Sequence, residues 1–93
     1  MQRAAVSDKK AQIIEVGRRL WQRGMVAAND GNLSCRQDTG FLITRSGVSK
    51  GFLLPEDILE LDNEWQKLAG EGLISSEYKL HQALYAAYPE VRA

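Results

Sequence analysis

The spacing of apolar residues near the N-terminus predicts an α-helix. Between Ser7 and Gly24, the larger apolar side chains and one glycine recur at intervals of three, four and seven, the period of one helix face: Ile13, Ile14, Gly17, Leu20 and Trp21. Ser7 is a residue type that caps a helix N-terminus, and Gly24 is one that ends a helix. We therefore predict a helix over residues 7–24 that packs on a sheet or on a neighbouring subunit.

The middle of the chain shows the shorter periods of β-strands. Apolar and polar residues alternate over 33–36, a turn follows at 37–40, and residues 41–44 continue as a buried strand, which together predict a β-hairpin. Pro55, with two acidic residues behind it, is typical of the first position of a helical turn. Residues 58–62 alternate again. We therefore predict a three-stranded antiparallel meander.

Helical spacing returns towards the end of the chain. From Ser76 onward the apolar residues keep the period of a helix, and Pro89 ends the run; they are Leu80, Ala83, Leu84 and Ala87. Ser75 or Ser76 can cap this helix, and the Glu77 carboxylate in its first turn suits the positive end of the helix dipole. Residues 91–93 then approach a further strand.

Composition narrows the possible partners. The 93 residues correspond to one small domain or to a piece of a larger one, and 44% hydrophobic with 26% charged residues indicates a soluble chain that folds. Twelve basic and twelve acidic residues cancel, so no global field attracts nucleic acid. One cysteine excludes an intramolecular disulfide, and the apolar runs are too short to span a membrane. We expect a cytoplasmic protein that binds neither nucleic acid nor membranes.

Three polar turns carry the chemistry that an anion needs. Residues 29–32 form a tight glycine-centred turn, residues 45–51 form a polar loop with two glycines, and serines 75–76 lie at the start of the last helix. Backbone N–H groups of such turns, hydroxyl groups and a helix N-terminus together bind phosphate. The middle loop lacks the glycine spacing of a nucleotide-binding P-loop. Each turn alone is more often a plain turn, but the combination makes a phosphate site a candidate beside that interpretation.

Glu77 is the candidate for proton transfer. It could act as a general acid or base if burial raised its pKa, or as a metal ligand if imidazoles joined it; complementing the helix dipole is the simpler interpretation. His81, one helical turn later, can pair with Glu77 or serve as a hydrogen-bonded structural residue, because one Glu and one His do not complete a metal site. Cys35 has no histidine nearby in sequence, so we expect a small buried strand residue.

Four segments, in this order and spacing, resemble the N-terminal half of the class II aldolase/adducin family: residues 31–34, 41–53, 55–57 and 75–77. The resemblance implies an α/β protein, the N-terminal part of a three-layer α/β/α fold with a mainly antiparallel sheet. It also implies a homotetramer with sites near subunit boundaries, a small-molecule sugar phosphate as partner, and zinc or another divalent metal as cofactor.

The resemblance assigns roles to individual residues. Glu77 matches the acid/base carboxylate that also approaches the zinc, and six others match the binders of the substrate phosphate: Gly31, Asn32, Ser46, Gly47, Ser75 and Ser76. The implied activity is a metal-dependent aldolase that cleaves a C–C bond of a sugar phosphate such as L-fuculose 1-phosphate through an enediolate. The alternatives are a pentulose-phosphate 4-epimerase, a methylthioribulose-phosphate dehydratase or a non-enzymatic, adducin-like assembly module.

The metal-binding histidines of the family have no counterpart in the sequence. The resemblance implies a His-x-His pair a few residues after the last helix and a third histidine later, and His81 matches none of them. Residues 1–93 are therefore expected to be an incomplete domain that stops before this motif, with Glu77 as the sole metal-approaching residue. We expect the chain alone to be inactive and to bind no catalytic zinc.

Overall fold

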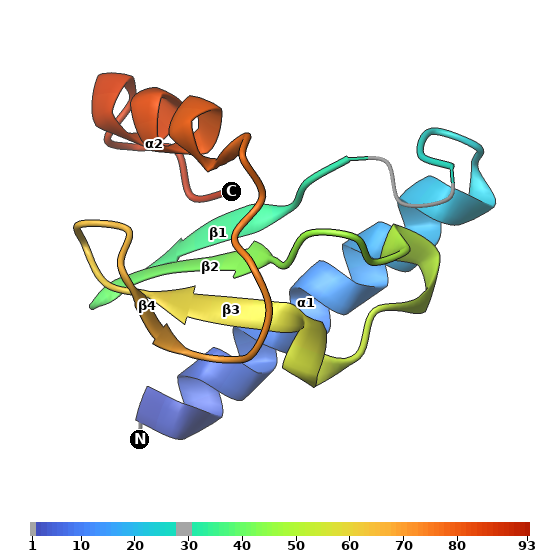
Figure 1. Ribbon diagram of the computed structural model, residues 1–93, viewed down its shortest axis with the longest axis horizontal. Coiled ribbons are helices and arrows are strands. Elements are labelled where there is room, and N and C mark those ends of the chain that lie inside the picture. The colour runs from blue at the N-terminus through green and yellow to red at the C-terminus, as the bar shows by residue number, and fades with distance from the viewer. Residues whose placement is uncertain (1, 28–30) are drawn as a thin grey trace.

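The computed structural model describes residues 2–27 and 31–93 (Figure 1). Helices α1 and α2 flank an antiparallel sheet whose strands pair in chain order, β1-β2-β3-β4. The elements are α1 (Gln2–Gln22), β1 (Ser34–Gln37), β2 (Gly40–Thr44), the 3-10 turns η1 (Lys50–Phe52) and η2 (Pro55–Asp57), β3 (Ile58–Leu61), β4 (Lys67–Ala69) and α2 (Tyr78–Ala87). The predicted hairpin, helical turn and fold class are confirmed. No helix among the described residues is long and apolar enough to cross a bilayer.

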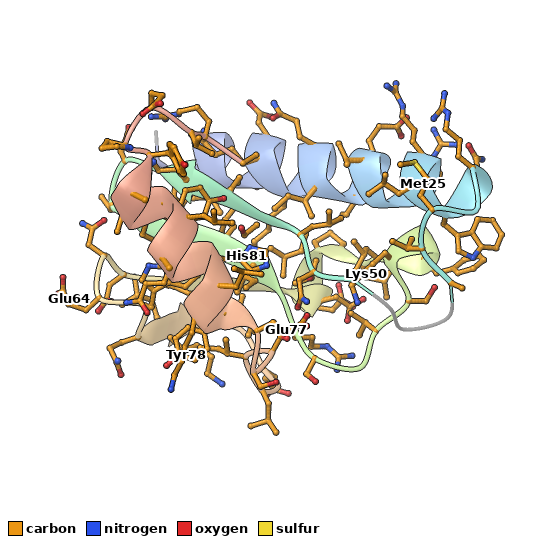
Figure 2. The ribbon with its side chains drawn as sticks, turned by 90° about the horizontal axis from the view of Figure 1, so that it is seen from above. Met25, Lys50, Glu64, Glu77, Tyr78 and His81 are labelled. Atoms are coloured by element: carbon orange, nitrogen blue, oxygen red, sulfur yellow. The ribbon has the colours of Figure 1, made fainter. Side chains whose placement is uncertain are left out.

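The alternation of strand residues creates two separate cores. Leu42 and Ile58 face α1, where they pack with Val6 and Ile13. On the other face Phe41, Ile43, Leu59 and Leu61 pack with Trp65 and with Tyr85 of α2. Figure 2 shows the resulting order of layers: α1, the sheet, then α2. The three-layer arrangement follows because the central strands are buried on both faces.

The sheet has four strands, so the prediction of a three-stranded meander is wrong: it missed the last strand, β4. The Asp62 carboxylate accepts the N–H groups of Glu64 and Gln66, both at 2.9 Å, and Trp65 takes a positive φ of 63°. This turn sends the chain back along β3 as β4. All three residues of β4 are exposed, so the strand lacks the alternation that marks a half-buried strand.

Helix α1 begins at Gln2, so the predicted cap at Ser7 is wrong. Ser7 is exposed within the helix, and the added turn carries Val6 into the core. The predicted end is confirmed: Gly24 has a φ of 70°, and the Met25 N–H donates to the Leu20 carbonyl at 2.9 Å. This bond satisfies a carbonyl group at the helix end.

Helix α2 begins one or two residues later than predicted. Its N-cap residue is Glu77, so neither Ser75 nor Ser76 occupies the cap position. The Ser75 hydroxyl instead accepts the Glu77 N–H at 3.2 Å. The helix packs through Tyr85, with Tyr78 partly buried, whereas Leu84 is 48% exposed.

Candidate functional site

Two of the three polar turns are joined at the end of β2. Arg45 and Ile74 form an isolated antiparallel bridge, and the Ser46 N–H donates to the Leu73 carbonyl at 2.9 Å. These bonds place the 46–47 turn beside the residues that lead into α2. They also occupy the Ser46 N–H, so the donor that Ser46 can offer to a ligand is its hydroxyl group.

The first turn is attached to the same strand end. The Thr44 N–H donates to the Leu33 carbonyl at 3.0 Å, and the Leu33 N–H donates to Thr44 Oγ1 at 3.2 Å. Gly31 and Asn32 therefore lie next to the end of β2, and Gly31 has a φ of 86°. The part of this predicted turn at Asn29 and Asp30 lies outside the described residues.

The three turns surround a polar cleft of about 280 Å³. Its lining includes five of the six predicted phosphate binders, the predicted acid/base residue and two cations: Gly31, Asn32, Ser46, Gly47, Ser75, Glu77, Arg45 and Lys50. Ser76 is exposed and does not belong to the lining, so its role stays a prediction. The structure thus brings together residues from three separate parts of the sequence.

Glu77 stands at the N-terminal end of α2, where the Asn32 side-chain amide donates a hydrogen bond to its Oε1. The carboxylate is exposed, and Figure 2 shows it on the side of α2 that faces Lys50. A carboxylate that is held by one amide and open to the cleft can exchange a proton with a bound molecule. Its role as acid or base remains a prediction.

His81 belongs to a hydrogen-bond chain rather than to a metal site. Its Nδ1 lies 2.7 Å from the Ser34 hydroxyl, which lies 2.8 Å from the Tyr85 hydroxyl. Burial lowers the pKa of the His81 imidazole, while the Glu77 carboxylate opposes this shift; burial also raises the pKa of Tyr85. The described residues contain no group of three or more His, Cys, Asp or Glu side chains placed to hold a metal ion. They therefore do not form the implied zinc site by themselves.

Arg45 and Lys50 belong to the predicted 45–51 loop, but neither was predicted to bind the phosphate. Arg45 Nε donates to Asp57 Oδ1 at 3.0 Å, and the buried Lys50 Nζ donates to the Val48 carbonyl at 2.6 Å. Both cations come from the 45–51 loop, whose polar composition was the available signal. Contacts with Asp57 and α1 decide which side chains of this loop turn towards the cleft. The sequence of the loop alone does not reveal these contacts.

Two other features, Cys35 and a pair of arginines on α1, lie apart from the polar cleft. Cys35 is partly buried in β1 against the α1 core, as expected, and burial raises the pKa of its thiol. Arg18 and Arg19 are exposed and pair with the Glu15 carboxylate at 2.6 and 2.8 Å. The Arg18 hydrogen bond, followed by that of Arg19, lowers the pKa of Glu15. These arginines form a solvated helix face.

The fold and the cleft agree with one family of proteins. A family model described as Class II Aldolase and Adducin N-terminal domain matches residues 11–93, and the chain belongs to this family. The family is generally dependent on divalent metal ions and oligomeric, and it processes sugar phosphates.

Individual relatives differ in the reaction that they are named for. A methylthioribulose-1-phosphate dehydratase from Pseudoalteromonas translucida is 42% identical over 82 residues, which cover 88% of this chain and 39% of the relative. A 5-methylthioribulose-1-phosphate/5-deoxyribulose-1-phosphate aldolase from Escherichia coli is 34% identical over 93 residues, 100% of this chain and 42% of the relative. The crystal structure of L-fuculose-1-phosphate aldolase from Thermus thermophilus superimposes with a TM-score of 0.71 at 36% identity, covering 88% of this chain and 42% of that one. This chain spans about two-fifths of the length of these relatives.

Proposed function

We propose that this chain supplies the phosphate-binding and proton-transfer residues of a ketose-phosphate lyase, and that the reaction is the dehydration of 5-methylthioribulose 1-phosphate. The observation that carries the proposal is the polar cleft, in which hydroxyls, a side-chain amide and two cations surround one space beside Glu77. The dehydratase is preferred to the L-fuculose 1-phosphate aldolase expected from the sequence, because the relative named as a dehydratase is the more similar in sequence.

The cleft offers donors from three segments to a phosphate group. Because the Ser75 hydroxyl accepts the Glu77 N–H, its own proton can be donated to a phosphate oxygen. The Ser46 hydroxyl and the Gly47 turn approach from the end of β2, and the Asn32 amide approaches from the first turn. Hydrogen bonds to an ionised phosphate are shorter and stronger than those between neutral groups. The phosphate would therefore fix one end of the substrate.

Glu77 is then the group that moves a proton at the carbon chain. Dehydration of a hydroxyketone removes a proton from the carbon beside the carbonyl and expels the hydroxyl group of the next carbon as water. A carboxylate can accept that proton, and the Asn32 hydrogen bond keeps the Glu77 carboxylate facing the cleft. We assign no step to the zinc ion that the family implies, because the described residues do not form a site for it.

Aldol cleavage is the second candidate reaction. It is supported by the E. coli aldolase, whose alignment includes all of this chain, and by the Thermus structure. The same phosphate contacts would serve, but a C–C bond would break and Glu77 would exchange a proton with the enediolate. The epimerase and the adducin-like assembly module remain alternatives, and in the last of these the cleft would bind no substrate. Assembly into a homo-oligomer is part of the proposal.

A chimera tests the reaction. In the chimera, residues 1–93 of this chain replace the corresponding part of the P. translucida dehydratase. The product formed from 5-methylthioribulose 1-phosphate is identified by mass spectrometry. We expect loss of water, and we expect Glu77→Gln in the chimera to lower kcat by a factor of about 10² to 10⁴. Glu64→Gln, an exposed carboxylate in the β3–β4 turn, is the control and should leave kcat unchanged. C–C cleavage products would instead support the aldolase, and full activity of Glu77→Gln would refute its role.

A further inference from the structure

We propose that a chain of three hydrogen-bonded side chains positions the Glu77 carboxylate at the polar cleft by fixing the first turns of α2 to β1. The three side chains are those of Ser34, His81 and Tyr85. The proposal rests on the proposed function, in which Glu77 moves a proton. None of the three residues lines the polar cleft. They are therefore positioning residues, which act on the reaction only through the place that Glu77 occupies.

The Ser34 hydroxyl connects the two helix side chains. It lies 2.7 Å from His81 Nδ1 and 2.8 Å from the Tyr85 hydroxyl. A hydroxyl has one proton, so Ser34 donates to one neighbour and accepts from the other. Ser34 and Tyr85 are only 9% and 5% exposed, so water replaces a lost partner poorly. Removing any one of the three groups therefore leaves a buried polar group without its partner and weakens the whole chain.

The strand end of this chain is tied to the residue that holds Glu77. The Leu33 N–H donates to Thr44 Oγ1 at 3.2 Å, and the Leu33 carbonyl accepts the Thr44 N–H at 3.0 Å. These bonds fix Asn32 and Ser34, on either side of Leu33, to the end of β2. Asn32 donates to the Glu77 carboxylate, and Ser34 binds the next turn of the same helix. Helix α2 is thus attached at two successive turns.

The other contacts of the first turn of α2 restrict the Glu77 side chain less. The Glu77 N–H donates to Ser75 Oγ, which fixes the backbone, but the exposed side chain makes no capping hydrogen bond. The Tyr78 ring lies 6.3 Å from the Trp65 ring, which limits the tilt of the helix towards the sheet. Hydrogen bonds depend more steeply on angle than such ring contacts do. The hydrogen bonds to Asn32 and to Ser34 therefore set the direction of the carboxylate.

The phosphate contacts do not depend on this attachment of α2. Ser75 precedes the helix, and the bridge between Arg45 and Ile74 holds this segment to the end of β2. Loosening α2 should therefore move Glu77 and leave the phosphate end of the substrate in place. A displacement of about 1 Å at a reacting group can lower a rate by about 10²-fold. We therefore expect a lower kcat with little change in KM.

The chimera described above measures this effect. Tyr85→Phe keeps the ring and removes the hydroxyl, and we expect kcat to fall about tenfold while KM changes less than about threefold. His81→Phe should lower kcat about 10²-fold, and His81→Asn, whose amide can still bond to Ser34, should restore most of it. Gln82→Ala, at an exposed position of α2, is the control and should change neither constant. An equal loss in the two His81 variants, or an effect on KM alone, would overturn the proposal.

A measurement on the 93-residue chain separates this proposal from the proposed function. The side-chain amide of Asn32 donates to the Glu77 carboxylate, so its NMR chemical shifts report this contact, and Glu77→Ala gives the shifts of the broken contact. We expect Tyr85→Phe and His81→Phe to move the Asn32 shifts in the same direction as Glu77→Ala does. Gln82→Ala should leave these shifts unchanged.

Unchanged Asn32 shifts in folded Tyr85→Phe and His81→Phe would overturn the proposal and leave the proposed function intact. If the chimera has no activity, the proposed function fails, and the Asn32 shifts still decide whether the three side chains position Glu77. If His81→Phe does not fold, as judged by its thermal transition, Tyr85→Phe decides.

Discussion

A regular set of polar contacts fixes α2 to the first strand of the sheet. Glu77, His81 and Tyr85 follow one another at intervals of four along the helix. Glu77 accepts from Asn32, and the other two share the Ser34 hydroxyl, two residues further along the chain. Three side chains of one helix face thus contact two alternate residues, Asn32 just before β1 and Ser34 at its start. Glu77, the candidate acid/base residue, makes the first of these contacts, so its position depends on this row of contacts from Glu77 to Tyr85.

The titration of His81 tests this row of contacts. His81 is the only histidine in the sequence, so its ring protons can be followed by NMR without assignment of others. Because burial opposes the charged form, we expect a pKa below about 6.5 in the folded chain and near that value in urea. Glu77→Gln should lower the folded pKa further, since the Glu77 charge opposes the shift. A folded pKa at or above the value in urea would contradict the packing described for His81.

The lowered pKa of His81 also determines whether the stability of the fold rises or falls with pH. Between the folded pKa and about 6.5, the unfolded chain binds more protons at His81 than the folded chain does. The contribution of His81 to the free energy of unfolding should therefore decrease as the pH falls through this interval. Chemical denaturation at a series of pH values measures the effect, and His81→Gln should remove this part of the pH dependence.

At the scale of elements, the sequence predicted those segments whose apolar residues are buried. The apolar stripe of α1, the hairpin and β3 are all partly or fully buried, and all were found where expected, except that α1 begins at Gln2 rather than at Ser7. Strand β4 is exposed at each residue, so its pairing with β3 left no pattern to detect. In α2 the apolar period is genuine, but Leu80 and Leu84 are exposed and the helix packs through aromatic residues instead.

The candidate site was predictable to a similar extent. The polar turns could be found because glycine, asparagine and serine have local conformational preferences that a sequence reveals. The Ser46 N–H donates to the Leu73 carbonyl, and Lys50 packs against α1. Both contacts join segments that are distant in the sequence. Local sequence does not encode such contacts directly, which is why the two cations were missed.

The close approach of α1 to η1 can be tested at Gly17. Gly17→Ala would force a methyl group against the Lys50 carbonyl oxygen, so either the helix or η1 must move. We expect a loss of about 1 to 3 kcal/mol in the free energy of unfolding, measured with urea. Gln12→Ala, at an exposed position of the same helix, is the control and should change stability by less than about 0.5 kcal/mol. A neutral Gly17→Ala would mean that η1 moves at little cost.

At the scale of the whole molecule, one groove is larger and more apolar than the polar cleft. Its volume is about 430 Å³, and it lies between α1, β1 and α2, with Val16, Leu33 and Leu84 among its lining residues. β1 is also one of the two edge strands of the sheet, and its Arg36 N–H donates to the Arg92 carbonyl at 2.7 Å. Unpaired strand edges and uncovered apolar surfaces promote association. We therefore predict that the chain self-associates through this groove and the neighbouring edge of β1.

Light scattering over a range of concentrations tests this location. We expect a dimer or larger species for the wild type, and a shift towards monomer for Leu84→Glu, which places a charge in the groove. Leu80→Glu is the matched control, because Leu80 is exposed on the same helix but does not line the groove. A monomer at all concentrations, or an equal effect of both variants, would refute the predicted surface.

The order of the strands in the sheet indicates the order in which the elements fold. Because β1 to β4 pair in chain order, each pairing closes only a short loop, and such contacts form early in folding. The contacts of α2 with β1 and the residues just before it join positions 45 to 51 apart and close a much longer loop. We expect the meander to form first and α2 to dock afterwards. Since the polar cleft is lined by turns next to the meander and by Ser75 and Glu77 just before α2, the ability to bind an anion would arise only in the last step of folding.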